Sequence, residues 1–256
     1  MSLRADEVRS RKGGPRLAML TAYDHPVAAA LDRAGLDLIL VGDSLGEVEL
    51  GYDTTRVVTL AMMEHHVRAV RNGVRRTHLV ADLPAGTYRD PAEALRSARA
   101  LATAGADSVK LEGAHVPEVR AILSAGIPVM GHVGLLPQTS EVYRRQGTTP
   151  ESAARIVADA RLLDDAGVYA IVIEATDADV ARRVTDAVAA PTIGIAAGDA
   201  TDGQVLVSTD LLGLNPEPPR FVTPKADLFA QIVRAGEAFG AEVREGPPGG
   251  SKTRRS

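Results

Sequence analysis

Short, continuously apolar runs alternate with alanine-rich stretches along this chain, and this alternation constrains its fold more than any other feature. The runs lack the strict apolar–polar alternation of half-exposed strands, so they predict strands that are buried on both faces. We expect strands at residues 17–24, 38–44, 77–84, 108–113, 128–134, 170–175 and 191–198, and a weaker one at 220–223. Between them, the spacing of apolar residues predicts helices at 26–34, 59–72, 91–104, 117–125, 150–166, 178–189 and 226–239.

Four of these helices end in the dipeptide Ala-Gly just before the next strand. A glycine just past the end of a helix can adopt the left-handed conformation that closes it. Regular alternation of strand and helix predicts an α/β protein with a parallel sheet. Eight such strands favour a single closed (β/α)8 barrel of the TIM type, with a doubly wound open sheet as the main alternative. We assign residues 1–243 to this one catalytic domain and expect the Pro- and Gly-rich residues 244–256 to be disordered.

The composition excludes several classes of function. The formal net charge is -4 and aromatic residues make up 3% of the chain, which argues against a nucleic-acid partner. There are no cysteines, so disulfides, a thiolate nucleophile and Cys-ligated zinc are excluded. No apolar run is long enough to span a membrane, and the start lacks the apolar core of a signal peptide. We therefore expect a cytoplasmic protein without a membrane partner.

Polar side chains collect where the predicted strands end. In a barrel these carboxyl-terminal ends open at one mouth, which is where the chemistry takes place. Charged groups on buried strands are unfavourable unless they are paired, hydrogen-bonded or bound to a metal. The set predicts a functional site rather than packing, and it comprises Tyr23, Asp24, Asp43, Ser44, Asp82, Lys110, Glu112, His132 and Glu174.

These residues also have structural interpretations. Asp24 could cap the following helix, Ser44 could belong to a turn, and His132 could be a hydrogen-bonded core histidine. The others could form structural ion pairs or, in the case of the last, face solvent: Asp43, Asp82, Lys110, Glu112 and Glu174. His65 and His66 are adjacent on a predicted helix and point in different directions, so we expect them at a surface or interface rather than as ligands.

The residue types at the mouth indicate metal-assisted chemistry on a small 2-oxo acid. Asp43, Asp82 and Glu112 are hard oxygen donors, which favour Mg²⁺ over zinc. A 2-oxo acid can chelate such an ion, which then acts as a Lewis acid on the enolate. Lys110 could neutralise the same developing charge. Glu174 is free to act as the base, because desolvation in a barrel mouth could raise its pKa towards working pH.

Seven short sequence motifs, between about residues 16 and 224, have the order and spacing seen in a known family. They are MLTAYD (19–24), LVGDSLG (40–46), ADLP (81–84), VKLEG (109–113), IPVMGHVGLLPQ (127–138), PTIGIAAG (191–198) and DGQVLV (202–207). Together they resemble the ketopantoate hydroxymethyltransferase family. The resemblance implies a barrel of the phosphoenolpyruvate/pyruvate-binding kind and a homo-oligomer, often a decamer.

The resemblance also implies which residues bind ligands. Asp43 and Asp82 would bind Mg²⁺, with Glu112 in the same shell. The 2-oxo acid would be contacted by Asp43, Ser44, Asp82 and Lys110. The family acts in pantothenate biosynthesis, and its substrate is 3-methyl-2-oxobutanoate.

For catalysis, the resemblance implies that Glu174 accepts the proton from C3 of the substrate. His132 would lie near the new hydroxymethyl group. The enolate would attack the one-carbon unit of 5,10-methylenetetrahydrofolate, giving 2-dehydropantoate and tetrahydrofolate.

The chain departs from the family pattern around these residues. Ala85 and Gly86 replace bulky residues, Ala175 replaces the usual cysteine, and Ala196 replaces the middle glycine of a Gly-rich phrase. The segment after Gln138 is also shorter than usual. A wider pocket would suit a paralogue that hydroxymethylates a larger 2-oxo acid, which is one alternative function.

Other functions remain open at this point. A carbon–carbon lyase or mutase of the phosphoenolpyruvate mutase/isocitrate lyase type uses a similar barrel, Mg²⁺ and an enolate. Its cleaving members usually employ a catalytic cysteine, which this chain lacks. A folate-free aldolase is a further alternative. A non-catalytic binding protein has no reason to keep so many unfavourable charges at its strand ends.

Overall fold

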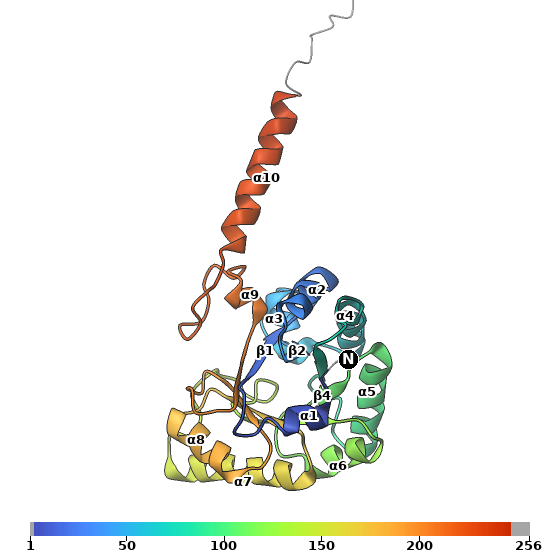
Figure 1. Cartoon of the computed structure of the whole chain (residues 1–256), viewed down its shortest axis with the longest axis vertical. Coiled ribbons are helices and arrows are strands. Elements are labelled where there is room, and N and C mark those ends of the chain that lie inside the picture. The colour runs from blue at the N-terminus through green and yellow to red at the C-terminus, as the bar shows by residue number, and fades with distance from the viewer. Residues whose placement is uncertain (1–2, 247–256) are drawn as a thin grey trace, which may run out of the picture. The chain divides into compact units, whose positions relative to one another are not determined.

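The computed structural model describes residues 3–246 and divides into two compact units between Val207 and Ser208. The first unit contains a closed barrel of eight parallel strands that follow one another in chain order (Figure 1). The predicted barrel is therefore confirmed, and the open sheet is excluded. The strands are β1 (Leu17–Thr21), β2 (Leu38–Val41), β3 (His78–Asp82), β4 (Ser108–Lys110), β5 (Val129–Gly134), β6 (Ala170–Glu174), β7 (Thr192–Ile195) and β8 (Gly203–Leu206).

Seven of the predicted strands are confirmed, but the eighth is wrong. Residues 220–223 form a turn and an irregular segment, and β8 lies instead at Gly203–Leu206. This short strand pairs with both β7 and β1 and so closes the barrel. No helix separates β7 from β8 along residues 196–202, so the strand–helix alternation used for the prediction gave no sign of it.

The long outer helices of the first unit pack against one another in the order α2, α4, α5, α6, α7 and α8, whereas the short α3 packs against η1. The predicted helices are confirmed within a few residues. The helices of this unit are α1 (Ala5–Arg9), α2 (His25–Ala34), α3 (Leu45–Val48), α4 (Leu60–Gly73), α5 (Pro91–Ala104), α6 (Val116–Ser124), α7 (Pro150–Ala166) and α8 (Ala178–Ala187), with a short 3-10 turn, η1 (Thr55–Val57).

Helix ends follow the sequence signals closely. The glycines of the four Ala-Gly phrases all have positive φ, as expected: Gly35, Gly105, Gly126 and Gly167. At the start of α2, Asp24 accepts a hydrogen bond from the backbone N–H of Val27 at 2.8 Å. The interpretation of Asp24 as a helix cap is therefore confirmed.

Side-chain alternation along the strands divides the barrel interior into layers. On β3, His78 lies near the amino-terminal end, Val80 lies in the apolar middle and Asp82 ends the strand. The middle layer is closed by apolar side chains such as Met130 and Val172. The interior is thus a packed core and not a pore, and it separates two polar regions at the two ends.

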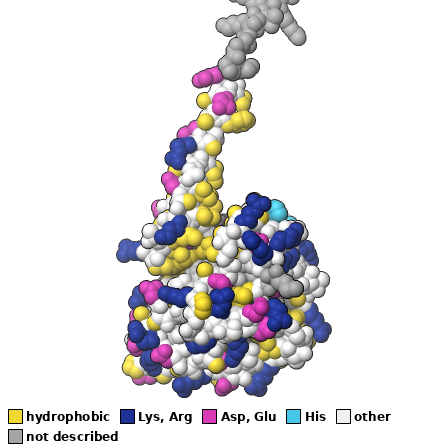
Figure 2. All heavy atoms as spheres, in the orientation of Figure 1, with side chains coloured by type: hydrophobic (Ala, Val, Ile, Leu, Met, Phe, Trp, Pro, Cys, Tyr) yellow, Lys and Arg dark blue, Asp and Glu magenta, His cyan; other side chains and the backbone are white. Residues whose placement is uncertain are grey.

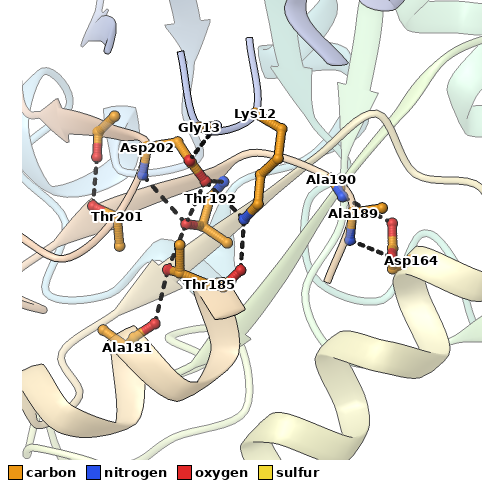
Figure 3. A network of polar contacts seen from close by, with 11 residues as sticks. Lys12, Gly13, Asp164, Ala181, Thr185, Ala189, Ala190, Thr192, Thr201 and Asp202 are labelled. Atoms are coloured by element: carbon orange, nitrogen blue, oxygen red, sulfur yellow. Dashed lines mark hydrogen bonds and ion pairs between the residues drawn. The ribbon is translucent and has the colours of Figure 1, made fainter. Parts of the chain in front are cut away.

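The amino-terminal end is held together by hydrogen bonds between loops and strands (Figure 3). Asp202, just before β8, accepts from the backbone N–H of Thr192 at 2.8 Å and of Gly13 at 2.9 Å. It also accepts from the ammonium of Lys12 at 3.0 Å. Asp164, near the end of α7, holds the segment before β7 by two backbone N–H groups in the same way. These links anchor β7, β8 and the segment before β1.

The second unit contains α9 (Ser208–Leu211) and α10 (Leu228–Glu245). No residue of α10 is buried, and Figure 2 shows hydrophobic side chains along it. Phe229, Ile232 and Phe239 are among its exposed hydrophobic residues. The predicted helix at 226–239 is confirmed as α10. It extends to Glu245, so the predicted disorder is wrong for residues 244–245, and residues 247–256 lie outside the described part of the chain. Among the described helices, none is long and apolar enough to cross a membrane.

Candidate active site at the carboxyl-terminal ends of the strands

The seven residues to which the sequence analysis assigned a catalytic, substrate-binding or metal-binding role gather at the carboxyl-terminal end of the barrel. They lie on or just after the five neighbouring strands β2 to β6 and are Asp43, Ser44, Asp82, Lys110, Glu112, His132 and Glu174. Five of them are buried, whereas Ser44 is partly exposed and the Glu174 side chain is 20% exposed. Glu174 is therefore the charged member of the set that is most accessible to a ligand.

Lys110 is the cation at the centre of the site. Its Nζ lies 2.8 Å from Asp82 Oδ1 and 3.4 Å from His132 Nδ1. Burial by itself would lower the pKa of Lys110, but the charges of Asp82, Glu112 and Asp43 outweigh it and raise that pKa. The ammonium therefore stays charged in spite of its burial.

The two other acids of the predicted metal set do not pair directly with Lys110. Asp43 Oδ2 accepts a hydrogen bond from Gln138 Nε2 at 2.7 Å, and Glu112 Oε2 accepts from the Gln138 backbone N–H at 3.0 Å. Burial and then the charge of Asp82 raise the pKa of Asp43 to about 7. Burial raises the pKa of Glu112 to about 9, even though Lys110 acts in the opposite direction. This end of the barrel therefore holds more acid than its single ammonium can neutralise.

His132 connects this group to Glu174. Its Nε2 lies 3.3 Å from Glu174 Oε2, and its Nδ1 faces the Lys110 ammonium. Burial and then the charge of Lys110 lower the pKa of His132, so the ring is neutral. An ammonium can only donate, so Nδ1 is the acceptor and the ring proton lies on Nε2, which is close to Glu174 but makes no aligned hydrogen bond to a described residue.

Ser44 lies beside this group rather than within it. Its Oγ is 2.8 Å from the hydroxyl of Tyr23 and makes no capping hydrogen bond to α3. Burial raises the pKa of Tyr23, so the ring keeps its proton. On α4, His65 is exposed, and the ring of His66 forms a hydrogen bond with the carbonyl oxygen of Tyr23.

The backbone around Glu174 has an unusual conformation. Ala175 and Ala196 have φ of 47° and 51° and are the two non-glycine residues with positive φ in the described chain. They directly follow Glu174 and its register partner on β7. Gly134, at the end of β5, also has positive φ, and a Cβ there would lie 2.3 Å from the Glu174 carbonyl oxygen. Such strain is typical of functional sites, where the surrounding structure holds it in place.

Gln138 is a member of the site to which the sequence analysis assigned no role. It is buried in the segment after β5 and contacts both Asp43 and Glu112. Its place next to Pro137, just beyond the strand that carries His132, was the available signal. An uncharged amide does not stand out in a search for charged residues, so it was missed.

In the described part of the chain, no three His, Asp or Glu side chains converge closely enough to hold a metal ion. Asp43 and Asp82 are nevertheless adjacent, since Asp82 Oδ2 accepts from the backbone N–H of Asp43 at 3.1 Å. Asp82 Oδ1 is buried and accepts no aligned hydrogen bond from a described residue. Mg²⁺ is usually held by one or two carboxylates, with waters and substrate oxygens completing its shell. The two aspartates fit such an ion, and Gln138 holds one oxygen of Glu112 beside them.

Comparison with known proteins points to one family. The sequence profile of ketopantoate hydroxymethyltransferase matches residues 3–248. The 3-methyl-2-oxobutanoate hydroxymethyltransferase of Ignicoccus hospitalis is 47% identical over 247 residues, which cover 94% of each chain. The protein of the same name from Moorella thermoacetica is 49% identical over 92% of this chain and 91% of its own length.

Solved structures share the fold at much lower identity. A 2,3-dimethylmalate lyase of the PEP mutase/isocitrate lyase superfamily superposes with a TM-score of 0.61 at 20% identity, over 100% of this chain and 93% of that one. A phosphonopyruvate hydrolase in complex with oxalate and Mg²⁺ superposes with a TM-score of 0.62 at 13% identity, over 99% and 92% of the two chains. These likenesses show that the barrel is of the same kind.

Proposed function

The chain belongs to the ketopantoate hydroxymethyltransferase family, and we propose that it transfers a hydroxymethyl group to C3 of 3-methyl-2-oxobutanoate. The one-carbon donor would be 5,10-methylenetetrahydrofolate, and with one water the products are 2-dehydropantoate and tetrahydrofolate. The observation that carries the proposal is the group of Asp82, Lys110, His132 and Glu174 at one barrel mouth, with Asp43 beside it. The sequence identity of 47% and 49% to two proteins named 3-methyl-2-oxobutanoate hydroxymethyltransferase supports the proposal.

A divalent cation such as Mg²⁺ is part of this proposal. Asp43 and Asp82 would hold it, and Glu112 would contact it through water. A cation bound there would supply positive charge beside the keto oxygen of the substrate. The Mg²⁺ and oxalate bound to a phosphonopyruvate hydrolase of the same fold support this choice.

Lys110 and Ser44 would orient the 2-oxo acid. The Lys110 ammonium is buried and remains charged, so it would stabilise the negative charge that develops on the keto oxygen. Ser44 would contact the substrate carboxylate with a hydroxyl that is already held by Tyr23. Both groups are fixed before substrate arrives, which reduces the reorganisation that the reaction requires.

Glu174 would be the base. Its carboxylate would take the proton from C3, and the electron pair of the broken C–H bond would form the enolate. C3 then forms a bond to the one-carbon unit as one carbon–nitrogen bond of the folate breaks. Water supplies the hydroxyl as the second carbon–nitrogen bond breaks, and the C3 proton and one proton of the water end on the two folate nitrogens. His132, which is neutral and has its Nε2 3.3 Å from Glu174 Oε2, would lie beside this carboxylate and the new hydroxymethyl group.

A panel of 2-oxo acids tests the function and its main alternative together. Purified protein, Mg²⁺ and methylenetetrahydrofolate are incubated with 3-methyl-2-oxobutanoate and with longer-chain analogues, and product is followed by NMR. We expect the five-carbon branched substrate to react fastest. A longer substrate reacting fastest would instead favour the paralogue suggested by Ala85 and Gly86. Turnover without folate would favour an aldolase.

The assembly and location stay predictions. A homo-oligomer, possibly a decamer, is expected from the family resemblance, and size-exclusion chromatography with light scattering would measure its mass. The predicted cytoplasmic location rests on the sequence alone.

A further inference from the structure

We infer that Gln138 is a positioning residue that determines which oxygens of Asp43 and Glu112 face the ligands. The inference deepens the proposed function and rests on it, since it concerns the acids assigned to the metal side of that site. Gln138 itself would contact neither substrate nor metal. It would act through the two carboxylates that it holds.

The contacts of Gln138 join three loops. Its Nε2 donates to Asp43 Oδ2 at 2.7 Å and to the carbonyl oxygen of Leu83 at 2.9 Å. Its backbone N–H donates to Glu112 Oε2 at 3.0 Å. One buried residue from the segment after β5 therefore connects the segments that follow β2, β3 and β4.

The orientation of the Gln138 amide is fixed by its partners. The carbonyl of Leu83 can only accept, so the group facing it must be the NH₂. On the other side, the hydroxyl of Tyr88 donates a short hydrogen bond to Gln138 Oε1. Burial and the charge of Glu112 raise the pKa of Tyr88, so this donor keeps its proton. A flipped amide would place its oxygen against both Asp43 and Leu83, which is unfavourable.

The consequence concerns the two oxygens of each acid. Gln138 occupies Oδ2 of Asp43 and Oε2 of Glu112. Oε1 of Glu112 is left facing His132, 3.8 Å from its Nδ1. Oδ1 of Asp43 is likewise left without a bond from Gln138. A carboxylate whose second oxygen is held by the protein cannot rotate freely, and this preorganises its free oxygen for a ligand.

The test is the affinity for Mn²⁺ in the absence of substrate, measured by EPR titration as a probe of the divalent site. Gln138→Met keeps the length and approximate volume of the side chain but removes the side-chain hydrogen bonds to Asp43, Leu83 and Tyr88, while the backbone N–H still donates to Glu112. We expect Mn²⁺ binding to weaken about 10- to 100-fold, the usual effect of losing a residue that orients metal ligands. Gln138→Asn, whose shorter amide cannot reach both Asp43 and Leu83, should also weaken binding and serves if the Met variant fails to fold.

Gln204 offers a matched control. Its Nε2 also donates two hydrogen bonds, to the Gly198 carbonyl oxygen at 3.0 Å and to Thr201 Oγ1 at 2.9 Å, but it contacts none of the acids. Gln204→Met should therefore leave Mn²⁺ affinity within twofold of the unmodified protein. A folded Gln138 variant that also binds within twofold overturns the inference and leaves the proposed function intact. An unmodified protein that binds no Mn²⁺ overturns the metal part of the proposed function, and the inference with it.

Discussion

The two ends of the barrel hold buried carboxylates under opposite conditions. At the amino-terminal end, Asp32 accepts from the backbone N–H groups of Arg76 at 2.8 Å and Thr77 at 2.9 Å. Burial by itself would raise the pKa of Asp32, but these hydrogen bonds outweigh it and lower that pKa to about 2. At the carboxyl-terminal end, burial raises the pKa of Asp43 to about 7 and that of Glu112 to about 9.

The difference shows that hydrogen-bond donors outweigh the effect of burial on the pKa of Asp32, whereas burial prevails for Asp43 and Glu112. Asp202 at the amino-terminal end has two backbone N–H groups and an ammonium, and its pKa is lowered in spite of burial. At the other end several acids share the one ammonium of Lys110. The amino-terminal end is thus complete by itself. The carboxyl-terminal end has more buried acids than groups to stabilise their charge, and the raised pKa values that result are common at functional sites.

The largest expected effect is catalytic and belongs to the carboxyl-terminal end. Replacing Glu174 with Gln removes the proposed base, so exchange of the substrate C3 proton should fall by about 100-fold or more. The measurement is ¹H NMR of 3-methyl-2-oxobutanoate in D₂O with the protein and Mg²⁺. Glu151→Gln, an exposed change at the start of α7, is the control and should exchange normally. Undiminished exchange in Glu174→Gln would disprove the base assignment.

At the amino-terminal end the main effect should be on stability. Asp32→Ala removes a buried carboxylate whose lowered pKa contributes stability above pH 4 and leaves two N–H groups without their partner. The free energy of unfolding should therefore fall by about 2–3 kcal/mol. Urea denaturation at pH 7 measures it, with the exposed Asp53→Ala as a control that changes little. Equal losses in the two variants would contradict the comparison.

The acids at the carboxyl-terminal end should make the protein less stable as the pH rises. The pKa values of Asp43 and Glu112 are raised on folding, so their contribution is fully present below about pH 4 and is lost as the pH rises towards about 7 and 9. Asp32 is ionised in both states over that range and adds no slope. Without divalent ions, these two groups together should lower the free energy of unfolding by about 2–3 kcal/mol per pH unit between pH 5 and 7.

Urea denaturation in EDTA at several pH values measures this slope. Glu112→Gln removes one of the two groups and should flatten the profile. A protein whose stability is constant or rises over this interval would show that these acids are not held as described.

The smallest expected effect concerns the backbone strain that accompanies the site. Ala196 has a φ of 51°, a conformation that suits glycine better than alanine. Ala196→Gly should therefore raise the free energy of unfolding by about 0.5–1 kcal/mol. Thermal unfolding followed by circular dichroism detects such a change. Ala197→Gly, at a buried neighbour without positive φ, should instead destabilise the protein, and the same sign in both would rule out relief of strain.

Local sequence signals were sufficient for most of the fold. Apolar runs and Ala-Gly helix ends located seven strands and the helices between them, because these features act within a few residues. They failed for β8, which has no helix before it along residues 196–202. Only the pairing of Gly203–Leu206 with strands on both sides reveals it as the closing strand. The eighth strand was therefore placed wrongly at 220–223 because its position depends on pairing with distant strands and not on local sequence.

By itself, the sequence determined that the acids, Lys110 and His132 would meet at one mouth, because parallel strands of a barrel all end on the same side. Only the tertiary structure decided how they pair. Lys110 bonds Asp82 rather than Glu112, its near neighbour in sequence, and Gln138 joins Asp43 to Glu112. The physical reason is that the order of the strands and the alternation of side chains along them determine at which end of the barrel a residue lies. Its hydrogen-bond partner depends on which other residue, often from a loop, comes within about 3 Å of it.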